Sequence, residues 1–283
     1  MAKKNKKLAY IILGMAAVII IIAIFGYFKI TGSTTVAAFL NIYQGNVQVD
    51  HGKGWVGAQD GMNLAEQDHV KTLQDSEAAV VLHESVIVNM APDTELFIKD
   101  LTKEHMKVEQ PSGSTWNKFT GIAGVEGYSV ETPTTVATVR GTGFEVNMES
   151  ILVGEGEVEV EYQGEKILVK IGKKAVIRDG QLVLEDFTEE DWKRIRREGS
   201  QTIEAWKTLR MKEVEKHPIL ARQLKKTYMV TDEDIKQKLE QADRGEFDLD
   251  ELAKKSPVQM ESVYKIKAFT EEIVKEYKKL ENK

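Results

Sequence analysis

The chain has 283 residues, of which 45 are Asp or Glu and 39 are Lys or Arg, so its formal net charge is −6. This acidic balance argues against nucleic acid as a partner, because binding to phosphates requires a cationic surface. The sequence contains no cysteine, which excludes disulfide bonds, thiol catalysis, cysteine-ligated metals and lipid attachment at cysteine.

Residues 8–28 form an uncharged and mostly apolar segment. As a helix it would extend about 31 Å, which matches the hydrocarbon core of a bilayer. Four lysines lie within residues 1–7, whereas only Lys29 follows the segment closely. The positive-inside rule therefore predicts a cytoplasmic tail of residues 1–7, a transmembrane helix at 8–28, a linker at 29–35 and an extracytoplasmic remainder.

The alternative for this segment is a cleaved signal peptide. Its apolar region would span only about 7–15 residues and would precede a site with small residues. The apolar run here is longer, and the nearest small residues lie beyond Lys29. The sequence therefore favours an uncleaved anchor, and it predicts a single-pass protein of the cell membrane with its N-terminus in the cytoplasm.

Residues 36–186 alternate between apolar and polar side chains in short runs separated by Gly, Asn and Asp. This pattern predicts a mainly β domain, built as a sandwich, a barrel or a solenoid-like roll. A weak internal repeat favours the roll, because GNVQV at residues 45–49 returns as GEVEV at residues 156–160. We expect an antiparallel roll or solenoid-like sandwich.

Residues 110–127 differ from the rest of this β domain, because Gly, Ser and Pro predict a loop there. Apolar residues nevertheless recur in the segment, mostly at a spacing of three. One interpretation is a loop that is packed over one end of the roll by these residues. The other is an exposed loop in which Trp116 and Phe119 contact a ligand.

Residues 128–146, YSVETPTTVATVRGTGFEV, consist of two alternating runs with a break at residues 140–143. Pro133 cannot donate a hydrogen bond to a neighbouring strand, so its strand should lie at an edge or begin near it. Gly141 and Gly143 allow a turn, a bulge or a close backbone approach. Arg140 either locks this turn by pairing with a carboxylate or backbone carbonyls, or faces an anion of a partner.

This segment resembles the signature of the FecR-type extracytoplasmic domain, whose TPTxVAxVRGTxFxV run closes a β domain. The resemblance extends back to residues 45–49 and forward to the GEGEVEV run at residues 154–160. It implies a FecR-like β domain over residues 36–186. The residues that match the signature, in a structural or partner-binding role, are Thr132, Pro133, Thr134, Val136, Ala137, Val139, Arg140, Gly141, Thr142, Phe144 and Val146.

Residues 187–283 change to a helical period. Thr188 precedes three acidic residues, which is typical of a helix N-terminus. An apolar stripe that includes Trp192 and Trp206 follows, and Phe269 and Ile273 belong to the stripe of a last helix that begins at Ser256-Pro257. Since exposed apolar stripes are unfavourable, these helices must pair with each other, with the β domain or with a second copy, which would make a homo-oligomer.

The sequence predicts neither catalytic residues, nor a metal site, nor a cofactor. Its five histidines are scattered, and it has no GxSxG, HExxH or GxxxxGK[ST] motif. The acidic strand at residues 155–161 is better explained as a solvated face. The DRGEFDLDEL run at residues 243–252 would place Ala242 and Arg244 where a calcium loop requires carboxylates.

Three functions remain open. The first is a membrane-anchored extracytoplasmic binding or scaffold module whose partner is a protein or an envelope polymer. The second comes from the resemblance, because FecR-like regulators pass an envelope signal to a sigma factor through a cytoplasmic helical domain. The seven residues before residue 8 leave no such domain, so this role would need a second membrane protein. The third is an enzyme that acts on an envelope polymer, but no constellation of acid, base or nucleophile supports it.

Overall fold

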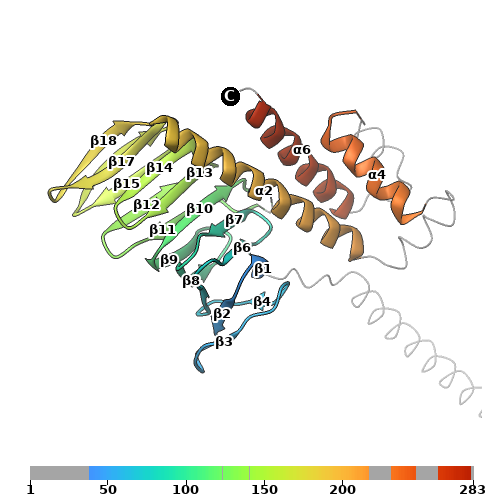
Figure 1. Ribbon diagram of the computed structural model, residues 1–283, viewed down its shortest axis with the longest axis horizontal. Helices are drawn as coiled ribbons and strands as arrows, with labels where there is room; N and C mark the ends of the chain where they lie inside the picture. The colour runs from blue at the N-terminus through green and yellow to red at the C-terminus, as the bar shows by residue number, and fades with distance from the viewer. Residues whose placement is uncertain (1–37, 123, 140, 217–230, 247–260, 282–283) are drawn as a thin grey trace, which may run out of the picture. The chain divides into compact units, whose positions relative to one another are not determined.

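The computed structural model describes residues 38–216, except 123 and 140, together with residues 231–246 and 261–281. All of these residues belong to one compact unit, Val36–Lys283. The described residues of this unit form two nine-stranded sheets, sheet A and sheet B, and three helices that come after them in the chain (Figure 1). The expectation of a mainly β region followed by a helical region is confirmed.

Sheet A contains the following strands in spatial order: β18 (Gln181–Asp186), β17 (Lys173–Arg178), β14 (Ser150–Glu155), β13 (Gly143–Asn147), β10 (Ser114–Phe119), β7 (Val86–Met90), β6 (Glu77–Leu82), β1 (Ala38–Gln44) and β4 (Asn63–Leu64). Sheet B contains β16 (Glu165–Lys170), β15 (Glu157–Tyr162), β12 (Thr135–Val139), β11 (Tyr128–Glu131), β9 (Met106–Ser112), β8 (Glu95–Leu101), β5 (His69–Thr72), β2 (Val47–Asp50) and β3 (Val56–Gly57). The chain passes repeatedly from one sheet to the other, and each sheet grows mostly in chain order. The alternation and the turn spacing of the sequence predicted the short strands, and they left open whether these form a sandwich, a barrel or a roll.

All strand pairs in the two sheets are antiparallel except β9 and β11, which are parallel. The inner faces of both sheets share one apolar core, to which the signature contributes Ala137, Val139, Phe144 and Val146. The break at residues 140–143 carries the chain from β12 in sheet B to β13 in sheet A. Gly141 has a φ of +77° there, a conformation that other residues rarely adopt.

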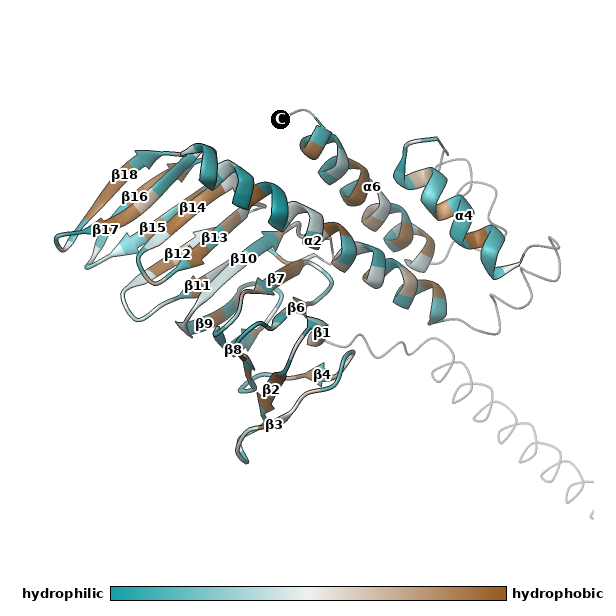
Figure 2. Cartoon of the chain, in the orientation of Figure 1, coloured by the Kyte–Doolittle hydropathy of each residue, from teal (hydrophilic) through white to brown (hydrophobic). Residues whose placement is uncertain are grey.

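The helices are α2 (Glu189–Glu215), α4 (Asp232–Asp243) and α6 (Glu261–Glu281). Thr188 caps α2 as the sequence predicts, because its hydroxyl accepts a hydrogen bond from the backbone N–H of Asp191. Thr231 caps α4 in the same way. Figure 2 shows that α2 and α6 carry both hydrophobic and hydrophilic residues, as amphipathic helices do.

A second apolar core joins α2 and α6 to the outer face of sheet A. Trp206 of α2 is fully buried and stacks on Phe269 of α6, with ring centroids 5.7 Å apart. Ala79, Val81 and Ile87 of sheet A belong to the same cluster. The part of the α2 apolar stripe around Trp206 is therefore buried within the chain, against α6 and sheet A.

The predicted loop at residues 110–127 is wrong for its first half, because residues 110–112 belong to β9 and residues 114–119 to β10. Residues 114–119 form strand β10, which lies between β7 and β13 in sheet A, and both Trp116 and Phe119 are buried. Its core-facing polar residues are hydrogen-bonded, since the Tyr128 hydroxyl donates to Asn117 Oδ1 at 2.6 Å and Asn117 Nδ2 donates to Thr115 Oγ1 at 2.8 Å. In the sequence these polar residues resemble those of a loop, whereas in the structure they are buried in a central strand and hydrogen-bonded.

Several sequence predictions concern residues outside the described ranges. They are the cytoplasmic tail, the membrane helix and the linker at residues 1–35, the turn residue Arg140 and the start of the last helix at Ser256-Pro257. Within the part of the chain that the structure describes, no helix has the length and hydropathy needed to cross a bilayer.

Candidate functional site: a polar pocket between α2 and sheet A

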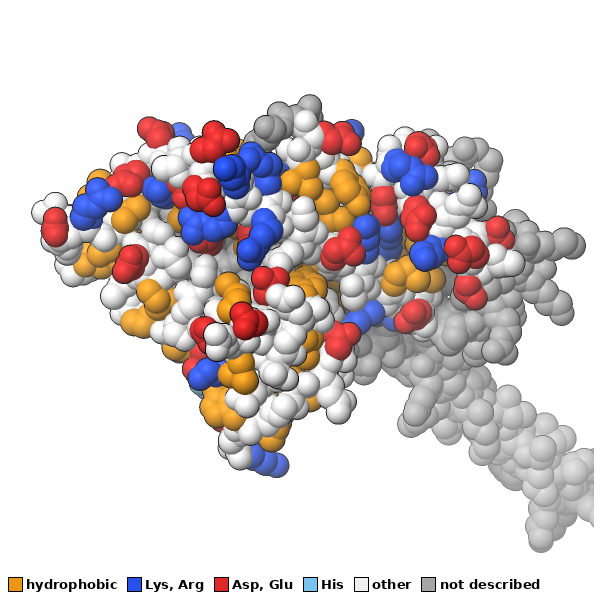
Figure 3. Space-filling view, viewed as in Figure 1, with side chains coloured by type: hydrophobic (Ala, Val, Ile, Leu, Met, Phe, Trp, Pro, Cys, Tyr) orange, Lys and Arg blue, Asp and Glu red, His pale blue; other side chains and the backbone are white. Residues whose placement is uncertain are grey.

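A pocket of about 230 Å³ lies where the first half of α2 crosses the outer face of sheet A. Sheet A supplies side chains from β6, β7, β10 and β13, and α2 supplies side chains from successive turns of the helix. The lining residues are Glu77, Asn89, Met90, Ala91, Ser114, Trp116, Glu145, Arg194, Arg197, Glu198 and Gln201. Figure 3 shows basic and acidic side chains close together over the region that α2 crosses.

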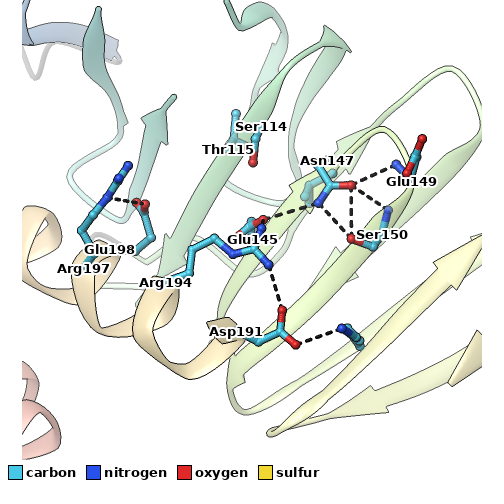
Figure 4. Close-up of polar contacts among 12 residues, drawn as sticks. Ser114, Thr115, Glu145, Asn147, Glu149, Ser150, Asp191, Arg194, Arg197 and Glu198 are labelled. Atoms are coloured by element: carbon cyan, nitrogen blue, oxygen red, sulfur yellow. Dashed lines mark hydrogen bonds and ion pairs between the residues drawn. The ribbon is translucent and has the colours of Figure 1, made fainter. Parts of the chain in front are cut away.

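The α2 side of the pocket is held in place by the polar contacts that begin this helix (Figure 4). The Asp191 carboxylate accepts hydrogen bonds from the Thr188 backbone at 2.8 Å and from Lys174 Nζ of β17 at 2.9 Å. Arg194 Nη2 also donates to Asp191, at 2.8 Å. These contacts lower the pKa of Asp191 far below its usual range, against the effect of its burial. Asp191 is therefore ionised and fixes Arg194 at the pocket.

Glu145 lies on β13 between two core residues, Phe144 and Val146, so its side chain points to the outer face of sheet A. It is only 3% exposed. Arg194 Nη1 lies 3.2 Å from one of its carboxylate oxygens, and the side-chain amide of Asn147 donates to the same carboxylate at 3.4 Å (Figure 4). Burial nevertheless raises the pKa of Glu145, because these partners do not fully offset the loss of hydration.

Glu198 lies one helical turn after Arg194 and faces the same pocket. Burial raises its pKa to about 7. Its nearest cationic atom is Nε of Arg197, at 3.8 Å (Figure 4), and Arg197 also lies 3.4 Å from Glu77 of β6. One exposed guanidinium is thus shared between two carboxylates, and the Asn89 side chain gives Glu198 a further hydrogen bond, but together they do not offset the effect of burial on its pKa.

One buried N–H group from a side chain that lines the pocket, Nε1 of Trp116, has no acceptor within hydrogen-bonding distance among the described residues, and this residue is 6% exposed. Asn89, which is 3% exposed, uses its side-chain amide on both sides. Its Oδ1 atom accepts a hydrogen bond from the Tyr43 hydroxyl at 3.3 Å, and its side chain is also hydrogen-bonded to Glu198. Buried donors are almost always paired in folded proteins, so an ordered water molecule or a ligand is expected at the Trp116 indole.

The pocket therefore combines carboxylates, two guanidinium groups and the indole of Trp116. A polar molecule is the kind of ligand that such a set can bind and orient. No group of three or more His, Cys, Asp or Glu residues that could hold a metal ion occurs in the described ranges. The guanidinium groups of the pocket belong to ion pairs with Glu145, Asp191, Glu77 and Glu198.

The residues that match the FecR signature are close in sequence to Glu145 of this pocket, but their own contacts stabilise the β sandwich. Thr132 closes the turn between β11 and β12, because its hydroxyl accepts from the backbone N–H of Thr135 at 2.9 Å. Pro133 and Thr134 are exposed in that turn, and Val136 is half-buried opposite Glu161 of β15. The other apolar members of the signature, Ala137, Val139, Phe144 and Val146, face the core. Gly143 allows the close approach of Trp116, whose Cζ2 would lie 2.9 Å from an added Cβ.

The two residues predicted to contact a ligand have different positions. Trp116 lines the pocket, although it is on a strand and not on a loop, whereas Phe119 packs in the core of the sandwich. The sequence reasoning missed Glu145, Glu198 and Asn89. Glu145 carried a visible signal, since it is a charged residue between two apolar residues of the signature. Glu198 resembled any charged residue of an amphipathic helix.

Comparison with protein families gives one match, in which residues 68–164 fit the family described as FecR protein. This confirms the resemblance over those residues, which begin before β5 and end after β15. Comparison with curated proteins gives no match.

Among solved structures, the chain is similar to two crystal structures of a putative anti-sigma factor from Parabacteroides distasonis ATCC 8503, at 1.65 and 2.50 Å resolution. The sequence identities are 14% and 15%, and the TM-scores are 0.36 and 0.37. Each alignment covers 42% of this chain and 59% of the other. This chain thus spans less than two thirds of those proteins.

Proposed function

We propose, from the premise that residues 68–164 form a FecR-type domain, that this chain is a membrane-anchored extracytoplasmic binding module. Its partner is a protein or an envelope polymer, and the binding contributes to regulation at the cell envelope. The FecR match supports a regulatory role over a catalytic one. The apolar segment at residues 8–28 and the lysines before it support the membrane anchor and the extracytoplasmic position.

The observation that carries this proposal is the pocket between α2 and sheet A. It holds one buried donor without an acceptor, Nε1 of Trp116, and two carboxylates with raised pKa values, and both are costly in a site that serves folding alone. Groups that disfavour the folded state are typical of sites built to bind. The pocket also lies at the junction of α2 with the FecR-type domain, so occupancy can be relayed to the helices.

A second candidate is an envelope-signal regulator that acts through a partner on a sigma factor. The FecR family favours it. Deletion of the gene followed by measurement of sigma-dependent transcripts separates the two. Unchanged transcript levels would support a binding module without a signalling role. A change that depends on the pocket would support signalling. An envelope-polymer enzyme is a minor third candidate, tested by turnover of wall material.

Site-specific crosslinking in cells tests the main proposal. A photoreactive residue at Arg197, on the exposed rim of the pocket, should capture a discrete partner or polymer fragment. The same residue at Lys166, which is 56% exposed on the outer face of sheet B, is the control. Capture from both positions to the same extent, or from neither, would contradict the proposal. Protease added to intact cells tests the topology, because it should digest residues 36–283.

A further inference from the structure

We infer that this chain forms a symmetric dimer, in which β18 of one copy pairs with β18 of a second copy at the free edge of sheet A. Strand β18 is an edge strand that lacks the usual protection against such pairing. It lies apart from the pocket between α2 and sheet A, to which sheet A contributes only β6, β7, β10 and β13 and the residues next to them. Dimerisation through this edge is therefore independent of the pocket.

Strand β18 is the outermost strand of sheet A, and no described strand pairs with its outer edge (Figure 1). The backbone N–H of Phe187, just after β18, donates to Gly172, just before β17. Successive residues of a strand direct their backbone groups to alternate neighbours, so Leu182 and Leu184 direct theirs to the free edge. Helix α2, the next element in the chain, packs on β14 and β7, which are nearer the middle of the sheet.

The apolar side chains of β18 are incompletely buried. Leu184 lies opposite Ala175, which belongs to the core between the sheets, and yet Leu184 is 49% exposed. Leu182 packs against the same core and is half-buried. The core of the sandwich is thus open at this edge. A strand added to β18 would cover both leucines, because residues that lie opposite each other on neighbouring strands share one face of the sheet.

The edge of sheet B shows the protection that β18 lacks, since proteins commonly block a free edge with lysine, proline or a bulge. In β16, Lys166 and Lys170 are among the residues whose backbone faces the free edge, because the N–H of Ile171 donates to the residue before β15. The corresponding residues in the middle of β18 are Leu182 and Leu184. Strand β18 also contains no proline, and its pairing with β17 has no register shift.

The sequence of β18 favours a second copy as the added strand, because it is complementary to itself about Val183. A twofold axis at Val183 places Leu182 opposite Leu184 of the other copy, with their backbone groups facing each other as in a hydrogen-bonded antiparallel pair. It also places Gln181 opposite Glu185, so no like charges meet. Such a contact uses the same edge of both copies and closes on itself, which gives a dimer and not a filament.

Disulfide trapping tests the register, because the chain has no cysteine of its own. The two copies of residue 183 would form a non-hydrogen-bonded pair with Cα atoms about 4.5 Å apart, a separation that a disulfide bridges. Val183→Cys should therefore give a linked dimer when the full chain is oxidised in detergent micelles and analysed by electrophoresis without reductant. Glu185→Cys should not, because its two copies would be about 14 Å apart.

Sedimentation of the full chain in detergent micelles tests the contact without a crosslink. Leu184→Lys places a charge in the contact and should raise the dissociation constant of the dimer about tenfold or more. Leu168→Lys on β16 is the matched control, since Leu168 is also 49% exposed, and it should leave the dissociation constant unchanged. Thermal unfolding of both variants shows whether each remains folded.

The dimer is rejected if the wild type sediments as a monomer at every concentration, or if Leu184→Lys and Leu168→Lys have the same effect. It is also rejected if Leu168→Cys is trapped as readily as Val183→Cys, because trapping would then report only random collision of exposed edges. Oxidation of the Val183→Cys variant in intact cells distinguishes the occupants. A linked homodimer supports the second copy, whereas a disulfide to a different protein overturns it and assigns the edge to a partner's strand.

Discussion

The outer faces of the two sheets differ in what lies on them. On sheet A, Val81 and Ile87 are fully buried because Trp206 and other apolar residues of α2 and α6 pack on them. On sheet B, exposed and half-exposed ion pairs such as Lys166–Glu159 and Lys107–Glu131 take the corresponding positions. One face is therefore an internal interface and the other is surface, although both sheets share the same core.

The sequences of the strands show the same difference between the two sheets. Strands β6 and β7 of sheet A are almost entirely buried, and their sequences, EAAVVL and VIVNM, read as nearly continuous apolar runs. Strand β15 of sheet B, EVEVEY, alternates between exposed and buried residues. A strand that is covered on both faces loses the alternation that marks a strand covered on one. The continuous apolar runs therefore predict that the helices cover sheet A.

The largest test of the comparison is Trp206→Ala. This change removes the central residue of the second core, and we expect a loss of about 3–5 kcal/mol in the free energy of unfolding. Trp55→Ala is the matched control, because Trp55 is 40% exposed on sheet B, and it should cost less than about 1 kcal/mol. Urea denaturation of both variants measures the difference. Equal losses would show that the helices do not stabilise sheet A.

Much of the fold follows from the sequence by such local rules. The β-rich and helical regions, the Thr188 cap and the turn at Gly141 could all be predicted, because alternation, capping and positive φ are local properties. Strand β10 could not, since Thr115 and Asn117 are polar core residues whose partners come from other strands. The pocket could not be predicted for a related reason. Its carboxylates are unusual only because α2 crosses sheet A, and docking of a helix depends on tertiary packing.

A buried charged contact on sheet A provides the second test of the difference between the two sheets. Lys118 of β10 is 2% exposed and pairs with Glu155 of β14 and, at 2.7 Å, with Glu276 of α6. Lys118→Met should destabilise the protein by roughly 2 kcal/mol, less than the 3–5 kcal/mol typical of a broken buried pair, because Lys279 still contacts both carboxylates. Thermal unfolding measures this loss, and no change would mean that the pair is not needed to join α6 to the sheet.

The same pair predicts a dependence on acid pH. Its lysines hold the pKa of Glu155 far below the usual value, although burial alone would raise it. A depressed folded-state pKa contributes stability above the unfolded-state value of about 4.5, and that stability is lost as the pH falls further. The wild type should therefore lose more stability between pH 5 and pH 3 than Lys118→Met does. Parallel curves would contradict this assignment.

The crossing between the sheets gives a smaller effect. Gly141 has a φ of +77°, and no atom lies within 4 Å of an added Cβ, so the cost of a side chain there is backbone strain alone. Gly141→Val should lower the free energy of unfolding by about 1–2 kcal/mol. Gly141→Asn is the control and should cost less, because Asn tolerates the left-handed region. Equal stability of the valine variant and the wild type would show that the turn can adopt another conformation.

The smallest effect is expected for the ion pair on the outer face of sheet B. Lys166 donates to Glu159 at 2.8 Å, but the two side chains are 56% and 49% exposed. Water solvates both charges whether or not they touch, and salt screens them further. Lys166→Ala should therefore leave the midpoint of urea denaturation unchanged at physiological ionic strength. A loss as large as that of Lys118→Met would mean that sheet B is covered by a partner in solution, because only desolvation makes such a pair strong.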